Sequence, residues 1–486
     1  MRTRTIGSIV GACCLTIAAV AAAGPAVADS TSPLAGARPV YVTNSETANV
    51  SVFIADVQTG IPELDHPLAK SGVGARQMTF TPDGRNAYAS NSDDVTISAF
   101  SVGPLGRLTR LPGAAGTVHT GGTTPVGISV RPDGHTLYVA DVDDSTVTAY
   151  TIAADGSLTK LQIIDTTVAN PRGLSATPDG RFLYAGHGDD NPETRPGSVG
   201  AITAYAIGKD GSLTSIGSPI RVGKFCGTNA ITPDGHRLYL VCQDTDEIYG
   251  FSIGAGGGLT PLPRSPYTVS DFPEGIATSP DGRYVWVAGP GLGHEPEGPG
   301  AVSSFTIGSD GALTEVPGSP VKAGLFPVGI TVQPNGKFVY VSGGDAYGQL
   351  NAFRVGSTGR LFPLAGSPFR TGGVGPAFNS ASVRPDQGPT AAFTTTVNGR
   401  SAAFDAAAST DSDGTVTQYR WDFGDGTSRT TTVPQTTHTY ASPGTFHATV
   451  AVTDNEGCST TFIATGQAVL CNGTSAATTT HDIIVY

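Results

Sequence analysis

The chain has 486 residues, enough for more than one domain, with 65 Gly, 35 Pro and only 14% charged residues. This composition is typical of a turn-rich β protein and argues against a helical bundle. The formal net charge of −12, without any cluster of Lys or Arg, argues against nucleic-acid and anionic-membrane partners.

Residues 1–28 are expected to be a secretory signal peptide. Arg2 and Arg4 supply the basic start, an apolar stretch runs over 6–23, and Ala26-Val27-Ala28 forms a small-residue cleavage site. An uncleaved membrane anchor is the alternative, which the weak hydrophobicity of this Ala/Gly-rich stretch disfavours. No later segment has the length and hydrophobicity of a membrane span. We therefore expect a secreted, extracellular protein.

Seven copies of one phrase follow, each with an apolar run and a Pro-Asp-Gly-like turn, and most continue with a second apolar run. The prolines of these turns lie 46–55 residues apart, at Pro82, Pro132, Pro178, Pro233, Pro280, Pro334 and Pro385. A repeat of about 40–50 residues built from short β-runs predicts the blades of a β-propeller. In each turn, proline presets φ, Asp accepts hydrogen bonds from its own backbone, and Gly accepts a positive φ.

One full repeat, residues 124–161, contains four short β-runs, here called strands a to d. Residues 41–43 form a b-strand that no a-strand precedes, whereas residues 379–383 form an a-strand that no b-strand follows. Pairing these two strands would complete the first blade and leave no exposed sheet edge. The sequence therefore predicts an all-β chain with a seven-bladed β-propeller over residues 38–385, closed by its N- and C-terminal strands.

Four cysteines follow the leader, and both pairs are expected to form disulfides in an oxidising compartment. Asp234 lies midway between Cys226 and Cys242, so an antiparallel hairpin centred on its turn places the two cysteines opposite each other. Cys458 and Cys471 would close a loop near the C-terminus. A metal site is the rival interpretation, although neither pair has a companion Cys/His pair at finger spacing.

The repeat stops after residue 385, and residues 386–389 are predicted to be a linker. Residues 390–486 are Thr-rich, alternate apolar and polar side chains, and contain a single buried-type Trp421. Their number and pattern predict a small Ig-like β-sandwich as a second domain.

Two resemblances follow from particular motifs. Residues 41–44 (YVTN), the turn phrase that continues into Tyr-Val, and residues 366–369 (GSPF) resemble the YVTN/lactonase-type β-propeller family. This resemblance implies the fold of enzymes that act on sugar-derived or muconate-type lactones, and of many secreted proteins without assigned chemistry. The tail, above all residues 421–426 (WDFGDG), is similar to a PKD domain, but carries extra residues between Cys458 and Cys471. That similarity implies an accessory module that binds polysaccharide or protein, or a spacer.

The residues that open the a-strands are expected to surround the channel mouth, on the face that carries the long loops. They are Arg76, Val126, Arg172, Gly227, Glu274, Val328 and Asn379. Arg76 and Arg172 are candidate catalytic residues that would hold an anion, with Glu274 as base or hydrogen-bond acceptor. Asn379 is a candidate ligand-binding residue. The alternative is a structural Arg–Glu network around a water-filled pore. Lactone-active relatives generally carry histidine at these openings, which this chain lacks.

Two long loops add further candidates on the same face. His187 and His294 are candidate ligand-binding residues, and Asp189, Asp190 and Glu295 are candidate metal ligands. Oxygen ligands suit Ca²⁺, and added histidines would suit other divalent metals, whereas the alternative is an acidic, solvated rim. The acidic DSDG turn at 411–414 is a second candidate Ca²⁺ site that turn chemistry explains equally well. No cofactor is required by either interpretation.

Two functions are compatible with this sequence. The first is a secreted scaffold whose propeller binds a small molecule or glycan and whose PKD domain binds cell-surface polysaccharide or protein. The alternative is an extracellular lactone hydrolase, similar to 6-phosphogluconolactonase. The missing histidines favour binding, whereas the charged channel mouth favours hydrolysis, so enzyme activity stays open at this point.

Overall fold

The computed structural model describes residues 36–188, 199–269, 272–291, 299–344 and 347–486. These residues form β-strands and connecting turns, with three short 3₁₀ segments: η1 (Gly113–Gly116), η2 (Gln243–Thr245) and η3 (Ser475–Ala477). None of the described segments is a helix with the length and hydropathy that crossing a membrane requires. The all-β prediction is confirmed.

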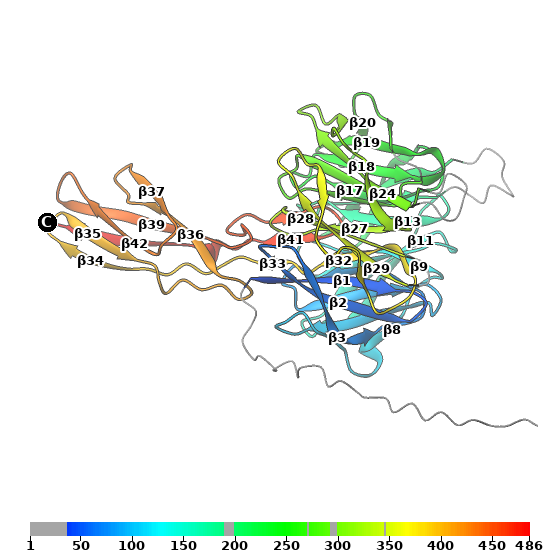
Figure 1. Ribbon diagram of the computed structural model, residues 1–486, viewed down its shortest axis with the longest axis horizontal. Coiled ribbons are helices and arrows are strands. Elements are labelled where there is room, and N and C mark those ends of the chain that lie inside the picture. Colours follow the sequence, from blue (N-terminus) through cyan, green and yellow to red (C-terminus); the bar gives the residue numbers. More distant parts are fainter. Residues whose placement is uncertain (1–35, 189–198, 270–271, 292–298, 345–346) are drawn as a thin grey trace, which may run out of the picture. The chain divides into compact units, whose positions relative to one another are not determined.

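Seven antiparallel sheets of four or five strands make up the propeller within the described residues (Figure 1). The innermost strands are β4 (Ala75–Phe80), β9 (Pro125–Val130), β13 (Pro171–Ala176), β17 (Cys226–Ile231), β22 (Gly275–Thr278), β27 (Gly329–Val332) and β32 (Pro376–Val383). The second strands are β1 (Ala37–Asn44), β5 (Asn86–Asn91), β10 (Thr136–Asp141), β14 (Phe182–His187), β18 (Arg237–Cys242), β23 (Tyr284–Gly289) and β28 (Phe338–Gly343).

The outer half of each blade is more variable. The third strands are β2 (Asn49–Asp56), β6 (Thr96–Val102), β11 (Thr146–Ile152), β15 (Ala201–Ile207), β19 (Glu247–Ile253), β24 (Pro299–Ile307) and β29 (Gln349–Val355). Three blades end in one outer strand: β3 (Pro62–Lys70), β12 (Leu158–Asp165) and β16 (Leu213–Arg221). Four end in two short ones: β7 (Leu108–Arg110) and β8 (Thr117–His119), β20 (Leu259–Pro261) and β21 (Tyr267–Thr268), β25 (Leu313–Glu315) and β26 (Val321–Leu325), and β30 (Leu361–Pro363) and β31 (Phe369–Arg370).

The two ends of the propeller meet in one blade. Strand β32 pairs antiparallel with β1, placing Tyr41 opposite Ser382 and Val42 opposite Ala381, in the sheet that also contains β2 and β3. Each innermost strand contacts the next one along the chain, and β32 contacts both β27 and β4. The predicted pairing of the N- and C-terminal strands is therefore confirmed.

The Pro-Asp-Gly turns have the predicted chemistry. In one of them, Gly134 has φ +77°, its N–H donates to the Arg131 carbonyl at 2.8 Å, and Asp133 accepts from the His135 N–H at 3.0 Å. A side chain at Gly134 would strain this conformation, which explains glycine at this place in the turn.

A recurring hydrogen bond joins each blade to the next. The aromatic residue of each second strand donates to the carbonyl of a glycine in the c–d turn of the following blade, at 2.7–2.9 Å. The pairs are Tyr41–Gly106, Tyr88–Gly156, Tyr138–Gly211, Tyr184–Gly257, Tyr239–Gly311, Trp286–Gly359 and Tyr340–Gly60. The last pair joins the seventh blade to the first. The tyrosine of the repeated phrase is therefore an inter-blade connector.

We expect Tyr138→Phe to lower the free energy of unfolding by about 1–2 kcal/mol, because the buried Gly211 carbonyl loses its donor. Chemical denaturation measures this change. Tyr347, whose side chain is 63% exposed, provides the control, and Tyr347→Phe should change stability by less than about 0.5 kcal/mol. Equal stability of the two variants would contradict the connector role.

The C-terminal residues form a separate sandwich. Its sheets contain β34 (Thr394–Asn398), β35 (Ser401–Asp405) and β38 (Gln435–Thr439) on one side, and β36 (Val416–Asp422), β37 (Ser428–Thr431), β39 (Gly444–Asp454) and β42 (Thr478–Val485) on the other. Trp421 is fully buried between Phe393 and Phe404, as its isolated position predicted. Both predicted disulfides, Cys226–Cys242 and Cys458–Cys471, are present.

The extra residues enclosed by Cys458–Cys471 leave the sandwich and enter the propeller channel. They form β40 (Ile463–Ala464) and β41 (Val469–Asn472), and β41 pairs in parallel with β33 (Asp386–Gln387). The predicted linker at 386–389 thus begins as a strand. Sandwich and propeller belong to one compact unit, and Figure 1 labels β33 and β41 beside β1 and β32. We call residues 463–472 the channel hairpin.

A buried ion-pair cluster joins the propeller to the sandwich. Arg38 of β1 donates to Asp413 at 2.7 Å and to Glu456 at 2.8 Å, and it also pairs with Asp386. Side chains of Arg38, Asp386 and Glu456 are almost inaccessible to solvent. Because an unpaired buried charge is costly, this cluster strongly couples the two parts of the chain.

Candidate functional site at the channel mouth

Each inner strand begins after a residue with positive φ, which turns the chain from the rim into the channel. These residues are Gly74, Thr124, Asn170, Phe225, Phe272, Phe326 and Gly375. In four blades the next residue is the proline of the Pro-x-Gly phrase, whose fixed φ suits the start of an extended strand. The turns place the predicted residues Arg76 and Arg172 near the start of β4 and β13, and Glu274 directly before β22, so these residues belong to every second inner strand.

Arg172 lies between two aromatic rings. Its guanidinium carbon is 4.3 Å from the centre of the Phe225 ring and 5.2 Å from that of Phe378. Its Nε atom is buried without a hydrogen-bond partner, and its side chain forms no ion pair with any described residue. Burial lowers the pKa of Arg172, and nearby Arg76 lowers it further, whereas Glu274 raises it. This guanidinium is held in place by stacking and retains its donors for an additional acceptor.

Glu274 is the acidic member of the group, with a side chain only 9% exposed. Burial raises the pKa of its carboxyl from 4.5 to about 7, although Arg172 and Arg76 attract its charged form. No hydrogen bond or ion pair joins its carboxylate to another residue in the described part of the chain. A carboxyl group with this pKa exchanges a proton near neutral pH, as a general acid or base requires.

Arg76 is the third member of the group and belongs to strand β4, which β9 separates from the strand of Arg172. Its Nε donates to the Ser92 hydroxyl at 3.0 Å, which fixes the side chain of this half-buried residue. Its charge acts on both Arg172 and Glu274. The three predicted catalytic candidates therefore influence one another electrostatically, with two positive groups acting on one carboxyl.

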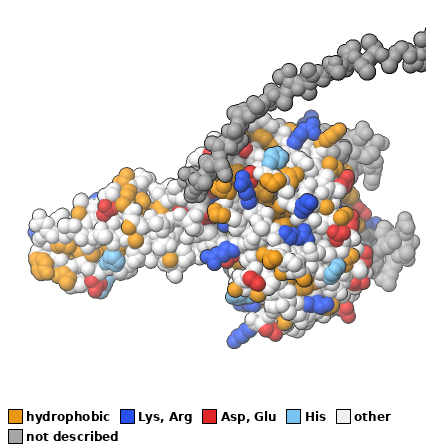
Figure 2. Space-filling view, turned by 90° about the horizontal axis from the view of Figure 1, so that it is seen from below, with side chains coloured by type: hydrophobic (Ala, Val, Ile, Leu, Met, Phe, Trp, Pro, Cys, Tyr) orange, Lys and Arg blue, Asp and Glu red, His pale blue; other side chains and the backbone are white. Residues whose placement is uncertain are grey.

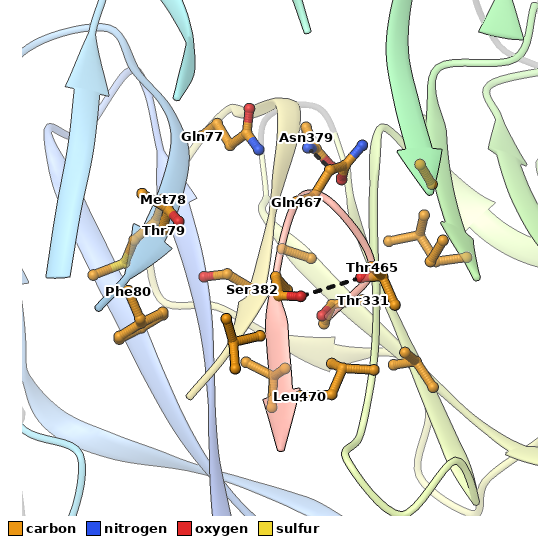
Figure 3. A pocket seen from close by; sticks show the side chains of 18 of the residues that line it. Gln77, Met78, Thr79, Phe80, Thr331, Asn379, Ser382, Thr465, Gln467 and Leu470 are labelled. Atoms are coloured by element: carbon orange, nitrogen blue, oxygen red, sulfur yellow. Dashed lines mark hydrogen bonds between the residues drawn. The ribbon is translucent and has the colours of Figure 1, made fainter. Parts of the chain in front are cut away.

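Asn379 occupies a different place from the one predicted. Strand β32 opens at Pro376, three residues before Asn379, and the register of its pairing with β1 shifts between Asn44 and Val42. Asn379 lies inside this bulge with φ +51°. Its Nδ2 donates to Oε1 of Gln467 at 3.0 Å, at the tip of the channel hairpin (Figure 3). The amide predicted to bind ligand thus contacts the hairpin.

The hairpin fills most of the channel below this level. Figure 3 shows it between the inner strands, with Gln467 near Asn379 and Leu470 further along the channel. The remaining cavity, lined by hairpin and inner-strand residues, has a volume of about 30 Å³, room for one or two water molecules. The hairpin therefore leaves little free volume among the inner strands that it contacts.

Comparison with known families bears on both parts of the chain. Residues 31–224 match the lactonase, seven-bladed β-propeller family, and residues 383–469 match the PKD domain family. This chain joins a lactonase-type propeller to a PKD domain. Both resemblances predicted from the motifs are confirmed.

Solved structures show the same propeller fold. A putative 6-phosphogluconolactonase from Bacteroides fragilis superposes with a TM-score of 0.59 and 20% identity, covering 72% of this chain and 98% of that one. The periplasmic gluconolactonase of Pseudomonas aeruginosa gives a TM-score of 0.58 and 19% identity, covering 72% and 99%. A microbial collagenase of Vibrio alginolyticus is 43% identical over 63 residues, which are 13% of this chain and 8% of that protein. The chain thus spans only a small part of this last relative.

His187 is not a loop residue, contrary to the prediction. It ends strand β14 of the lactonase-type propeller and is fully buried. Its Nδ1 lies 3.2 Å from the Ala169 carbonyl and its Nε2 lies 2.8 Å from the Thr203 hydroxyl. Asn44, Asn91 and Asp141 end their strands in the same way, each bonded to a hydroxyl of the third strand. This position is therefore a repeated structural cap, and we do not propose it as a ligand contact.

The other loop candidates lie outside the described residues: His294, Asp189, Asp190 and Glu295. Among the residues that the structure describes, Asp386, Asp454 and Cys458 are a group with metal-ligand chemistry. The sulfur of Cys458 is in the disulfide, and Asp386 pairs with Arg38, so this group matches an ion-pair cluster better than a metal centre. A divalent metal remains a prediction from the sequence.

Three residues of the site escaped the sequence-based prediction: Phe225, Phe378 and Gln467. The phenylalanines resemble ordinary loop and strand residues. The only sequence signal for Gln467 was the departure from the PKD pattern, because it lies among the extra residues between Cys458 and Cys471.

Proposed function

We propose that the lactonase-type propeller binds a small, anionic, oxygen-rich ligand such as a sugar acid at the channel mouth. The observation that carries this proposal is Arg172, stacked between Phe225 and Phe378 with a buried, unpartnered Nε. Burying the Nε–H of this partly exposed residue without an acceptor is costly, so an anion that supplies acceptors to the guanidinium is stabilised. A carboxylate fits this need because it accepts two parallel hydrogen bonds from one guanidinium.

The neighbouring groups favour a hydroxylated ligand over a simple carboxylate. Arg76 adds a second positive charge, while Glu274 in its protonated form donates a hydrogen bond and in its ionised form accepts one. Aromatic rings beside the guanidinium offer an apolar surface for the carbon face of a sugar acid. On the propeller face that Figure 2 draws, Lys and Arg side chains are dispersed among acidic and apolar ones.

Calorimetric titration of the purified protein with D-gluconate tests this proposal. We expect Arg172→Ala to weaken binding about 10- to 100-fold, since a charge-assisted hydrogen bond is lost. Arg354 provides a matched control, because its guanidinium also stacks on an aromatic ring, that of Phe362, but on the outer surface. Arg354→Ala should bind like the wild type. Equal losses in both variants, or no binding by the wild type, would argue against the site.

Lactone hydrolysis is the second candidate function, favoured by the pKa of Glu274 near 7 and by the similarity of the propeller to a putative 6-phosphogluconolactonase and to a gluconolactonase. Ionised Glu274 would take a proton from water, whose oxygen forms the new bond to the lactone carbonyl carbon. Arg172 would stabilise the oxyanion until the ring C–O bond breaks and the leaving oxygen is protonated. Incubating the same proteins with D-glucono-1,5-lactone distinguishes the two candidates: turnover that Glu274→Gln abolishes identifies a hydrolase.

Secretion and the partner of the PKD domain belong to the same proposal. Two disulfides are compatible with an oxidising, extracellular compartment. In this setting the exposed faces of the PKD sandwich would bind cell-surface polysaccharide or protein. Retention of the protein on washed cell-wall material, compared with soluble glycan as competitor, measures this binding.

A further inference from the structure

We propose that the PKD domain completes the ligand site of the propeller, with Gln467 as the positioning residue for Arg172. This inference rests on the proposed binding function. It assigns to the channel hairpin a role beyond an accessory module, because the hairpin contacts the strands that carry the site from the inside of the channel.

Backbone hydrogen bonds hold the hairpin tip in the channel. The N–H of Ile231 donates to the Thr465 carbonyl at 2.9 Å, and the N–H of Ala176 donates to the Gly466 carbonyl at 3.1 Å. Ala176 ends strand β13, which begins beside Arg172, and Ile231 ends strand β17. The tip thereby supplies acceptors to two innermost strands that would otherwise have buried, unpaired donors.

Gln467 connects the tip to both sides of the Arg172 stack. On one side, its Oε1 accepts from Asn379, and Asn379 directly follows Phe378, one of the two rings on Arg172. On the other side, its amide donates to the Asn229 carbonyl. The Asn229 side chain donates to the Gly173 carbonyl at 3.1 Å, at the residue after Arg172. One glutamine side chain therefore braces the ring and the backbone that orient the guanidinium.

The channel hairpin is anchored at both its base and its tip, so it can support the strands that carry the Arg172 group. Its base is closed by Cys458–Cys471 and paired with β33, while Leu470 packs in the same apolar cluster as Val332 and Val383 of the inner strands. At the tip, Gly466 has φ +84°, and a side chain there would begin 2.8 Å from Cβ of Ser175. Glycine thus allows the close approach between tip and strand.

The experiment compares full-length variants. We expect Gln467→Ala to weaken D-gluconate binding about fivefold and to accelerate modification of Arg172 by phenylglyoxal severalfold, because the bracing hydrogen bonds are lost. Gln418, exposed on β36 of the sandwich, provides the matched control, and Gln418→Ala should match the wild type in both measurements. Mass spectrometry of the peptide that contains Arg172 follows the modification.

A second variant tests insertion itself. Gly466→Val should push the tip away from Ser175, so amide hydrogen exchange at Ala176 and Ile231 should become about tenfold faster, while exchange in β39 stays unchanged. Unchanged affinity and unchanged Arg172 modification in Gln467→Ala would overturn the proposal. So would exchange at Ala176 and Ile231 that is equally fast in the wild type and in Gly466→Val. If the wild type binds no gluconate, the proposed function fails, and Arg172 modification alone decides the positioning role.

Discussion

Replacing Arg38 by alanine is expected to lower the free energy of unfolding by about 3–5 kcal/mol at neutral pH, because it leaves buried carboxylates without a counter-charge. Arg38 pairs with Asp386, Asp413 and Glu456, and these contacts join the first strand of the propeller to the PKD domain. Chemical denaturation measures the loss. The difference from wild type should shrink at lower pH, because burial raises the pKa of Asp386 and this carboxyl no longer needs a counter-charge once it is protonated.

Arg85 provides the control for this substitution. Its guanidinium lies 3.8 Å from Asp83, but its side chain is 81% exposed and that of Asp83 is 48% exposed. Arg85→Ala should therefore cost less than about 1 kcal/mol. Similar losses for Arg38→Ala and Arg85→Ala would contradict the structural importance of the buried cluster.

Glu274→Gln is expected to change the pH dependence of stability. The pKa of Glu274 is raised from 4.5 to about 7 in the folded protein, so the folded state holds this proton more tightly than the unfolded state. Wild-type stability should therefore fall by about 3 kcal/mol between pH 4.5 and 7, relative to the variant, and should not recover at higher pH. Below pH 4.5 the carboxyl is protonated in both states and this contribution is fully present.

Denaturation of both proteins at several pH values measures this difference, since subtraction removes the contribution of all other titrating groups. Parallel stability curves from pH 4 to 8 would show that Glu274 titrates as an ordinary exposed carboxyl. Such a result would also remove the main argument for Glu274 as a base, because the argument depends on its burial at the channel mouth.

Much of the fold was predictable because each propeller blade is specified by short local sequence motifs. Gly134 and its neighbours specify their turn through backbone preferences that act over three or four residues. The pairing of β1 with β32 followed from counting strands, since each was the unmatched member of one blade. The cross-strand pairing of Cys226 with Cys242 could be predicted because both residues are equally far from the turn of one hairpin.

The errors arose where a side chain's place depends on register or on distant contacts. His187 was assigned to a loop because no sequence pattern shows that β14 continues to this residue. Nor does any pattern show that its imidazole forms a hydrogen bond with the Thr203 hydroxyl. Asn379 was assigned to the strand opening, whereas the register of β32 against β1 shifts by three residues, and Asn379 lies in the resulting bulge and bonds to Gln467. In both cases the neighbouring strand decides the position, and that strand is remote in sequence.

The sequence by itself determined the seven blades, their closure, the two disulfides and the charged residues around the channel mouth. These features depend on local turn chemistry and on the period of the repeat. Only the tertiary structure decided that Arg172 stacks between Phe225 and Phe378. The same holds for the ion pairs of Arg38 with three carboxylates that are distant in sequence, and for the insertion of the channel hairpin among the inner strands. These contacts join residues up to several hundred positions apart, so they exist only after the folded surfaces meet and exclude water.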